Sequence, residues 1–255
     1  MRLPGHLTLW LIAFCVLGLC GISSAKDDVG AMIALRGKTV IDRGNRTAEA
    51  KVKDSILLND TVSTLEASRA KMLFSDDSVL SLGERSKVVI KEYLYSRDKG
   101  GKSIFNLIDG KMKSVVGKTS FEIHTPTAVA AARGTIILTE SGVVGGKKFA
   151  TFICTEGELI ITSQDPRITD RVVLTAGMMI TIVEGEPFPA PSPASRSEIE
   201  RLESDTDFEG FEISILGPTH IGAEWLILDI PYAPPIGNQQ PPNRTTPVTI
   251  DLIFK

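Results

Sequence analysis

The chain has 255 residues, and its 28 Lys and Arg against 31 Asp and Glu give a formal net charge of −3. This length allows one large or two small domains with a sizeable hydrophobic core. Because basic residues are not in excess, the composition argues against nucleic-acid binding, which needs a basic surface to neutralise phosphates. The 22 Gly and 14 Pro residues indicate many turns, as an all-β domain with short strands requires.

The N-terminus predicts a secretory signal peptide over residues 1–25. Met1 and Arg2 supply a positively charged start, and Leu7–Cys20 is uncharged and mostly apolar. Small residues then precede a cleavage point between Ala25 and Lys26. The apolar run is shorter than the roughly 20 residues of a membrane-spanning helix. We therefore expect an exported chain without a transmembrane span after cleavage, located in a bacterial periplasm or secreted.

Cysteine usage fits this prediction but adds little. Cys15 and Cys20 leave with the signal peptide, so Cys154 remains alone and cannot form an internal disulfide. Lipid attachment at Cys20 is not expected, because Leu19 stands where a small residue would be needed.

From Val29 to about Val183 the sequence consists of short apolar or alternating segments separated by turn residues. No helical period of useful length occurs there. The segments predicted as strands include Met32–Leu35, Val40–Ile41, Ser55–Leu58, Ala70–Phe74, Val88–Ile90, Ile104–Phe105, Ala150–Cys154, Leu159–Ile161, Val172–Leu174 and Ile180–Val183. This regularity is typical of a sandwich, a barrel or a twisted β-solenoid, and the pattern alone does not choose among them.

The segment Thr125–Thr135 is the most unusual part of the sequence. It follows the alternating strand pattern of Phe121–His124, and Pro126 must interrupt that strand's hydrogen-bond ladder. Arg133 comes after a run of small apolar residues, where a buried guanidinium would need acceptors. A turn at Gly134 could supply carbonyl groups. We expect Arg133 to hold this loop to the sheet; a ligand-binding arginine is the alternative.

Together with this segment, several others resemble, in order, the motifs of the FecR-type envelope domain, a family named for the ferric-citrate regulator. They cover residues from about 30 to 185 and comprise Gly37–Val40, Leu58–Thr64, Ala70–Leu80, Phe105–Gly110, Thr125–Thr139 and Glu156–Ile161. The chain departs from the family pattern at Asp77, where glycine is usual, and at Ala132, where valine is common.

The resemblance implies a twisted all-β domain, solenoid-like or sandwich-like, over residues 26–185. It also implies a structural signature made by Thr125, Pro126, Arg133, Gly134 and Thr135. In the family this domain is best known for receiving a signal from an outer-membrane transporter and passing it to an inner-membrane regulator. Such regulators carry an anti-sigma segment and a membrane span ahead of the domain, where this chain has a signal peptide. The resemblance therefore implies the fold and a binding role but no relay across a membrane.

The character of the sequence changes after residue 185. Prolines at 187, 189, 191 and 193 favour a semi-rigid extended linker. Ser195 and Glu198 have the spacing of a capping box, which predicts one short helix ending by Asp205. We assign residues 186–207 to this linker and helix. Residues 208–255 predict three further strands, a small C-terminal β extension of unknown role.

Candidate catalytic groups are few. Adjacent residues of a strand point to opposite faces, so Asp76 and Asp77 cannot act as an acid–base pair, and a polar turn is expected. Cys154 lies in an apolar strand pattern, where an inert buried thiol is more usual than a nucleophile with His124 as its base. Gly145–Lys148 lacks the leading glycine of a phosphate-binding loop and predicts a hairpin turn. No closely spaced His, Cys or carboxylate cluster suggests a metal site.

We therefore predict a non-enzymatic, exported protein with no catalytic residue, metal or cofactor. Its expected partner is an unidentified envelope protein or glycan, bound in envelope signalling or regulation. The alternative is a structural or polysaccharide-associated envelope scaffold. The sequence leaves the oligomeric state open.

Overall fold

The computed structural model describes residues 28–96, 100–117 and 119–208. The chain divides into two units, residues 1–211 and 212–255, and all described residues belong to the first. The expected signal peptide with its cleavage point at Ala25 and Lys26 lies outside the described residues. So do the expected strands of the C-terminal extension.

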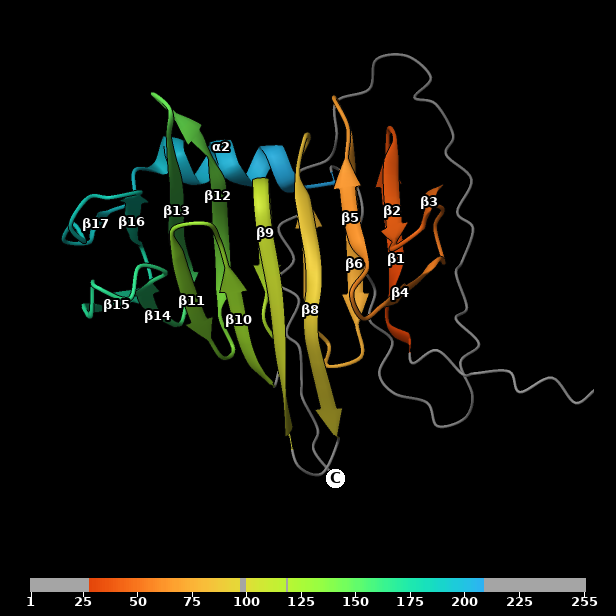
Figure 1. The fold of residues 1–255 in the computed structure, drawn as a ribbon, viewed down its shortest axis with the longest axis horizontal. Helices are drawn as coiled ribbons and strands as arrows, with labels where there is room; N and C mark the ends of the chain where they lie inside the picture. The colour runs from red at the N-terminus through yellow and green to blue at the C-terminus, as the bar shows by residue number, and fades with distance from the viewer. Residues whose placement is uncertain (1–27, 97–99, 118, 209–255) are drawn as a thin grey trace, which may run out of the picture. The chain divides into compact units, whose positions relative to one another are not determined.

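The strands of the first unit form two sheets, which confirms the predicted all-β fold (Figure 1). Almost every pair of neighbouring strands is antiparallel. Sheet A has the spatial order β4 (Ser55–Leu57), β1 (Asp28–Arg36), β6 (Arg69–Phe74), β7 (Val79–Leu82), the second part of β9 (Gly100–Val115), β12 (Ile136–Val144), β13 (Lys147–Glu156), β16 (Met178–Val183) and β17 (Ser192–Pro193).

Sheet B has the same plan. Its spatial order is β3 (Arg46–Glu49), β2 (Thr39–Arg43), β5 (Thr61–Thr64), β8 (Lys87–Ser96), the first part of β9, β10 (Ser120–His124), β11 (Ala128–Ala132), β14 (Glu158–Ser163) and β15 (Arg171–Thr175). Only the β9–β10 pair is parallel among these described strands. The chain moves repeatedly from one sheet to the other, as in a flattened solenoid.

Strand β9 belongs to both sheets. Its residues up to Asp109 pair with β8 and β10, whereas residues from Gly110 onward pair with β7 and β12. Gly110 has φ +94°, and a Cβ there would lie 2.4 Å from the Cα of Ser86. The crossing therefore requires glycine at this position, which is the last residue of the motif segment Phe105–Gly110 named above.

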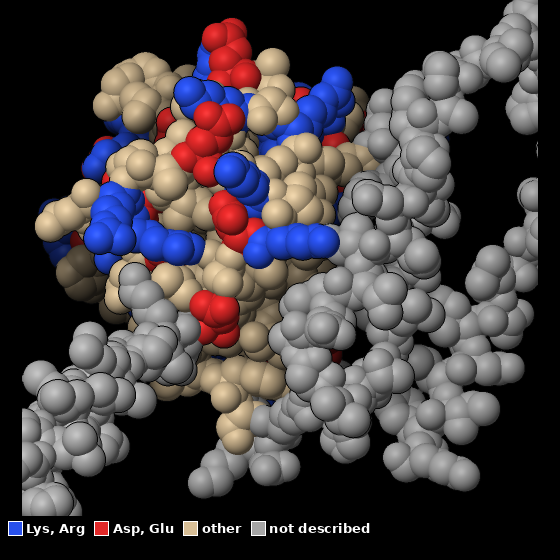
Figure 2. All heavy atoms as spheres, turned by 90° about the vertical axis from the view of Figure 1, so that its right-hand side faces the viewer, with Lys and Arg blue, Asp and Glu red and all other residues tan. Residues whose placement is uncertain are grey.

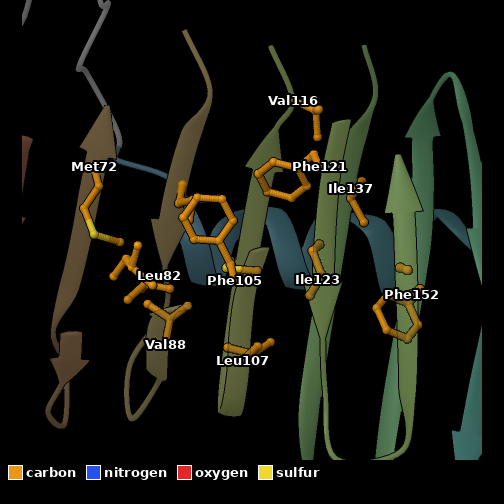
Figure 3. Packing of buried hydrophobic residues seen from close by; sticks show 14 of the residues in the cluster. Met72, Leu82, Val88, Phe105, Leu107, Val116, Phe121, Ile123, Ile137 and Phe152 are labelled. Carbon is orange, nitrogen blue, oxygen red and sulfur yellow. The ribbon is translucent and has the colours of Figure 1, made fainter. Parts of the chain in front are cut away.

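The hydrophobic core fills the space between the two sheets. Alternate residues of each strand point inward, as the period of two dictates, and Figure 3 shows Phe105, Phe121, Ile137 and Phe152 among the residues of this core. The rings of Phe74 and Phe105 lie 4.8 Å apart, and those of Phe105 and Phe121 lie 5.0 Å apart. This aromatic row joins strands of both layers.

Helix α2 (Arg196–Thr206) begins as predicted. The Ser195 side chain accepts a hydrogen bond from the Glu198 backbone N–H, and the Glu198 side chain accepts one from the Ser195 backbone N–H. The helix runs across the strands on the outer side of sheet A (Figure 1). Leu202 is buried there in a small second core with Leu138 and Ile153.

Candidate binding surface

Thr125 begins the unusual central segment by closing a bend between β10 and β11. Its backbone N–H and its Oγ1 both donate to the Ala128 carbonyl at 2.9 Å, and Oγ1 accepts from the Ala128 N–H at 3.1 Å. Thr125 is buried. Pro126 interrupts the regular pairing of the strands at this bend. The Thr125 hydroxyl therefore supplies hydrogen bonds to the Ala128 main chain there.

Thr135 closes the other end of β11. Its Oγ1 donates to the Arg133 carbonyl at 3.1 Å, and its own carbonyl accepts from the Val116 N–H at 2.9 Å. Gly134 between them has φ +59°, which lets the chain leave sheet B and enter sheet A. Thr125 therefore shapes the bend between β10 and β11 within sheet B, and Thr135 shapes the passage from β11 to β12 in sheet A.

The expectation that the Arg133 side chain holds this loop to the sheet is wrong. Its side chain is exposed, and no residue in the described part of the chain accepts a hydrogen bond from its guanidinium. Because Arg133 follows the last residue of β11, its carbonyl takes part in the bend while its charged group stays hydrated. A hydrated guanidinium avoids the free-energy cost of burying a charge. The loop is held by Thr125, Thr135 and backbone bonds instead.

The outer face of sheet B carries both polar and apolar side chains. We call the surface formed by Ile104, Glu122, His124, Val129 and Ile160 the open face. Strand alternation places these residues opposite the inward-pointing Phe121 and Ile123. No described helix or strand packs over them. Glu122, His124, Val129 and Ile160 are partly exposed, whereas Ile104 is buried among them, so a partner would meet mainly the first four residues.

An ion cluster lies at the centre of the open face. Glu122 Oε1 is 3.1 Å from Lys102 Nζ, and Glu122 Oε2 is 2.8 Å from His124 Nε2. Burial alone would raise the pKa of Glu122, but the hydrogen bonds from His124 and Lys102 outweigh it and hold that pKa below its usual value. The alternating pattern of Phe121–His124 predicted that Glu122 and His124 lie on one face of the strand. It did not predict Lys102, which the parallel pairing of β9 with β10 brings beside Glu122.

The outer face of sheet A is occupied by α2. Lys111 Nζ lies 2.5 Å from Asp205 Oδ2, and Lys113 Nζ lies 3.4 Å from Glu203 Oε1. Arg69 donates to the backbone carbonyls of Asp205 at 3.0 Å and Asp207 at 2.9 Å. Sheet cations thus pair with the acidic side chains and free carbonyls at the C-terminal end of the helix, where positive charge is favourable.

Cys154 and His124 are not brought together. Cys154 is fully buried on the inner face of sheet A, where its Sγ lies 3.4 Å from the carbonyls of Glu156 and Gly157. Burial, with a smaller contribution from Glu158, raises the pKa of this thiol. His124 points outward from sheet B. A dyad of these two residues is excluded by the two-layer geometry.

Asp76 and Asp77 form the predicted polar turn between β6 and β7. Asp76 is buried, and its carboxylate accepts hydrogen bonds from the Ser78 N–H at 3.1 Å and from Thr119 Oγ1 at 2.5 Å. The nearby Tyr93 has its pKa raised by burial and by Asp76. Asp77 has φ +65°, the left-handed conformation that glycine adopts most easily. This explains why glycine is usual at this position.

The predicted hairpin at Gly145–Lys148 is confirmed. Gly145 and Gly146 form a two-residue turn with φ +57° and +78° between β12 and β13. Lys147 pairs with Glu186 at 2.8 Å. The segment therefore has no phosphate-binding geometry.

A groove of about 510 Å³ lies between the loop after β14 and the turn after β16. Asp165 and Arg167 line it and pair with each other at 2.6 Å. Hydrogen bonds from Arg167 lower the pKa of Asp165 to about 2. Glu186 and Glu184 also line the groove, and each has a partner in the chain: Glu186 pairs with Lys147, and Glu184 accepts a hydrogen bond from the Lys148 N–H.

The described residues contain no group of three or more His, Cys, Asp or Glu that could hold a metal ion. Within the same part of the chain, no helix has the length and apolar character needed to cross a membrane. Acidic and basic side chains lie side by side on the face formed by the N-terminal strands, without a patch of one sign (Figure 2).

Residues 60–159 match the family model described as FecR protein, which confirms the resemblance over this part of the chain. Two crystal structures of an anti-sigma factor candidate from Parabacteroides distasonis ATCC 8503 are similar to the chain at 10% sequence identity and a TM-score of 0.45. Each alignment covers 55% of this chain and 62% of that one, so the chain spans less than two thirds of those proteins. A comparison with curated proteins found no match.

Proposed function

We propose that this protein is exported to the cell envelope and binds another envelope component through the open face, in envelope signalling or regulation. The observation that carries the proposal is the difference between the two outer faces of a FecR-type domain. The chain's own helix crosses the middle strands of sheet A, whereas the open face leaves Val129 and Ile160 partly exposed beside Glu122 and its partner Lys102. Apolar groups around a few placed charges are typical of a protein interface.

Site-specific photo-crosslinking in the host cell tests this proposal. A photoreactive residue at Val129 or Ile160 samples the open face, and one at Thr181 samples the outer face of sheet A as a matched control. We expect one protein to be captured from the open face and not from Thr181. Ile160→Lys combined with Val129→Lys should abolish the capture while the circular dichroism spectrum stays unchanged.

Two results would overturn the proposal. Equal capture from both faces would show that the open face has no special role. Recovery of glycan without a protein would favour the alternative, a polysaccharide-associated scaffold. Export is tested separately by the mass of the protein recovered from the envelope fraction, where cleavage between Ala25 and Lys26 should leave Lys26 as the first residue.

A further inference from the structure

Four described strands end the two sheets: β4 and β17 in sheet A, β3 and β15 in sheet B. A terminal strand leaves a row of backbone N–H and C=O groups unpaired, and proteins protect such edges with short strands, proline or charge. Strand β4 is three residues long, and β17 is two residues long and contains Pro193. Strand β3 carries Arg46 and Glu49. Strand β15 has five residues with Val172, Val173 and Leu174 at its centre, so it is the least protected of the four.

The hydrogen-bond pattern shows which groups of β15 are free. The Gln164 N–H donates to the Thr127 carbonyl at 3.0 Å, which directs the even-numbered residues of β14 toward β11. The odd-numbered residues then bond to β15, and their partners are Val172 and Leu174. The backbone groups of Arg171, Val173 and Thr175 therefore point away from the sheet, and all three residues are exposed.

We propose that β15 is an association site for a second copy of this chain, with the two β15 strands paired antiparallel and centred on Val173. This register is self-complementary, as a twofold dimer requires. Val173 lies opposite its counterpart, and Arg171 lies opposite Thr175. About six backbone hydrogen bonds form, because the three outward-facing residues each exchange bonds with their partners.

Side chains agree with this register on both faces of the strand. Val173 is 48% exposed on the outer face, and the paired strand would cover it. On the inner face, the half-buried Val172 would meet Leu174 of the second copy and extend the core across the interface. No like charges face each other, since Arg171 is opposite a threonine. Cross-strand apolar pairs of this kind stabilise antiparallel sheets.

The dimer is tested by sedimentation velocity on the full chain over about 5 to 500 µM, since an edge interface of small area binds weakly. Val173→Pro removes only an outward N–H, so pairing with β14 remains possible. We expect this variant to raise the dimer dissociation constant at least about tenfold. Val173→Lys is the second variant, in case proline disturbs the strand.

Thr47→Pro is the matched control. The Ala50 N–H donates to the Thr39 carbonyl at 2.8 Å, which directs the Thr47 N–H outward from the other end of sheet B. This change should leave the dissociation constant unaltered. A wild-type chain that remains monomeric throughout, or a dimer indifferent to both Val173 variants, would overturn the proposal.

A spin label at Val173→Cys tests the register. The two Val173 Cα atoms of the dimer should lie about 5.5 Å apart, so the labels should show a short mutual distance, whereas labels at Thr47→Cys should not. Cys154 is buried and its raised pKa slows its labelling. Long distances from both sites would contradict the pairing. The inference does not rest on the proposed function, because partner capture at Val129 or Ile160 can succeed or fail independently of dimerisation.

Discussion

The two sheets have the same strand plan, but their outer faces differ in what lies over them. On sheet A, Lys111, Lys113 and Leu138 face outward, and α2 covers them with acidic and apolar side chains of its own. On sheet B, Glu122 pairs with Lys102 and shares a hydrogen bond with His124 among the strands themselves. The lysines on the outer face of sheet A thus find their acidic partners on α2. Glu122 on the outer face of sheet B finds its partners within the same sheet, so that face can stay open.

The largest expected effect comes from removing the apolar anchor of α2. Leu202 is 1% exposed against Leu138 and Ile153, so Leu202→Ala should lower the free energy of unfolding by about 2–4 kcal/mol through lost burial and a cavity. Val129→Ala on the open face should cost less than about 1 kcal/mol, because that site is partly hydrated. Urea denaturation of both variants measures the difference, and equal losses would contradict the distinction between the faces.

A smaller loss is expected where the sheet holds the C-terminal end of the helix. Arg69 donates to two free helix carbonyls, and Arg69→Ala should cost about 1–2 kcal/mol, since hydrogen bonds from charged groups exceed neutral ones. Lys102→Ala on the open face removes a partly exposed ion pair and should cost at most about 1 kcal/mol. Thermal denaturation compares the stability of the two variants. A larger loss of stability for Lys102→Ala than for Arg69→Ala would contradict this prediction.

The N-terminal cap of α2 should contribute about 1 kcal/mol, and Ser195→Ala measures it. The hydrogen bonds from Ser195 lower the pKa of Glu198. A lowered pKa means that the stabilisation is present above the unfolded-state value of about 4.3 and is lost as the pH falls through the folded value. We therefore expect the cost of Ser195→Ala to shrink in acid. Ser195→Asp should preserve the cap at pH 7; unchanged stability in both variants would argue against the capping box.

The smallest effect is predicted for Glu122, whose ion pairs are partly exposed. Its pKa is also lowered, so Glu122→Gln should cost at most about 1 kcal/mol at pH 7. By the same linkage, this cost should disappear as the pH falls through the folded pKa of Glu122. Urea denaturation between pH 3 and 7 measures it, and a cost that grows in acid would show that the ion pairs are not stabilising.

Features set by neighbouring residues could be predicted from the sequence. The strand pattern, the Gly145–Gly146 hairpin and the cap at Ser195 depend on side chains within a few positions of one another. The polar turn at Asp76 and Asp77 belongs to the same class. The family resemblance then supplied the fold class, which period-two alternation alone could not distinguish among several all-β architectures.

Features set by distant residues could not be predicted. The parallel pairing that brings Lys102 beside Glu122 depends on how β9 and β10 meet, and no local pattern specifies that meeting. Arg133 was misplaced because an apolar run before it suggested burial, whereas its position just beyond the end of β11 turns the side chain into solvent. The docking of α2 on sheet A likewise depends on residues far apart in sequence.

The crossing of β9 from one sheet to the other restricts how the chain length can change during evolution. One residue inserted before Gly110 would exchange the inward and outward side chains along the paired part of the strand. Phe105 and Leu107 would then face water, and the shift would disturb β8 and β10 at once. Insertions should therefore be tolerated in the turns at the ends of the sheets, and the spacing from Phe105 to Gly110 should stay constant among related domains.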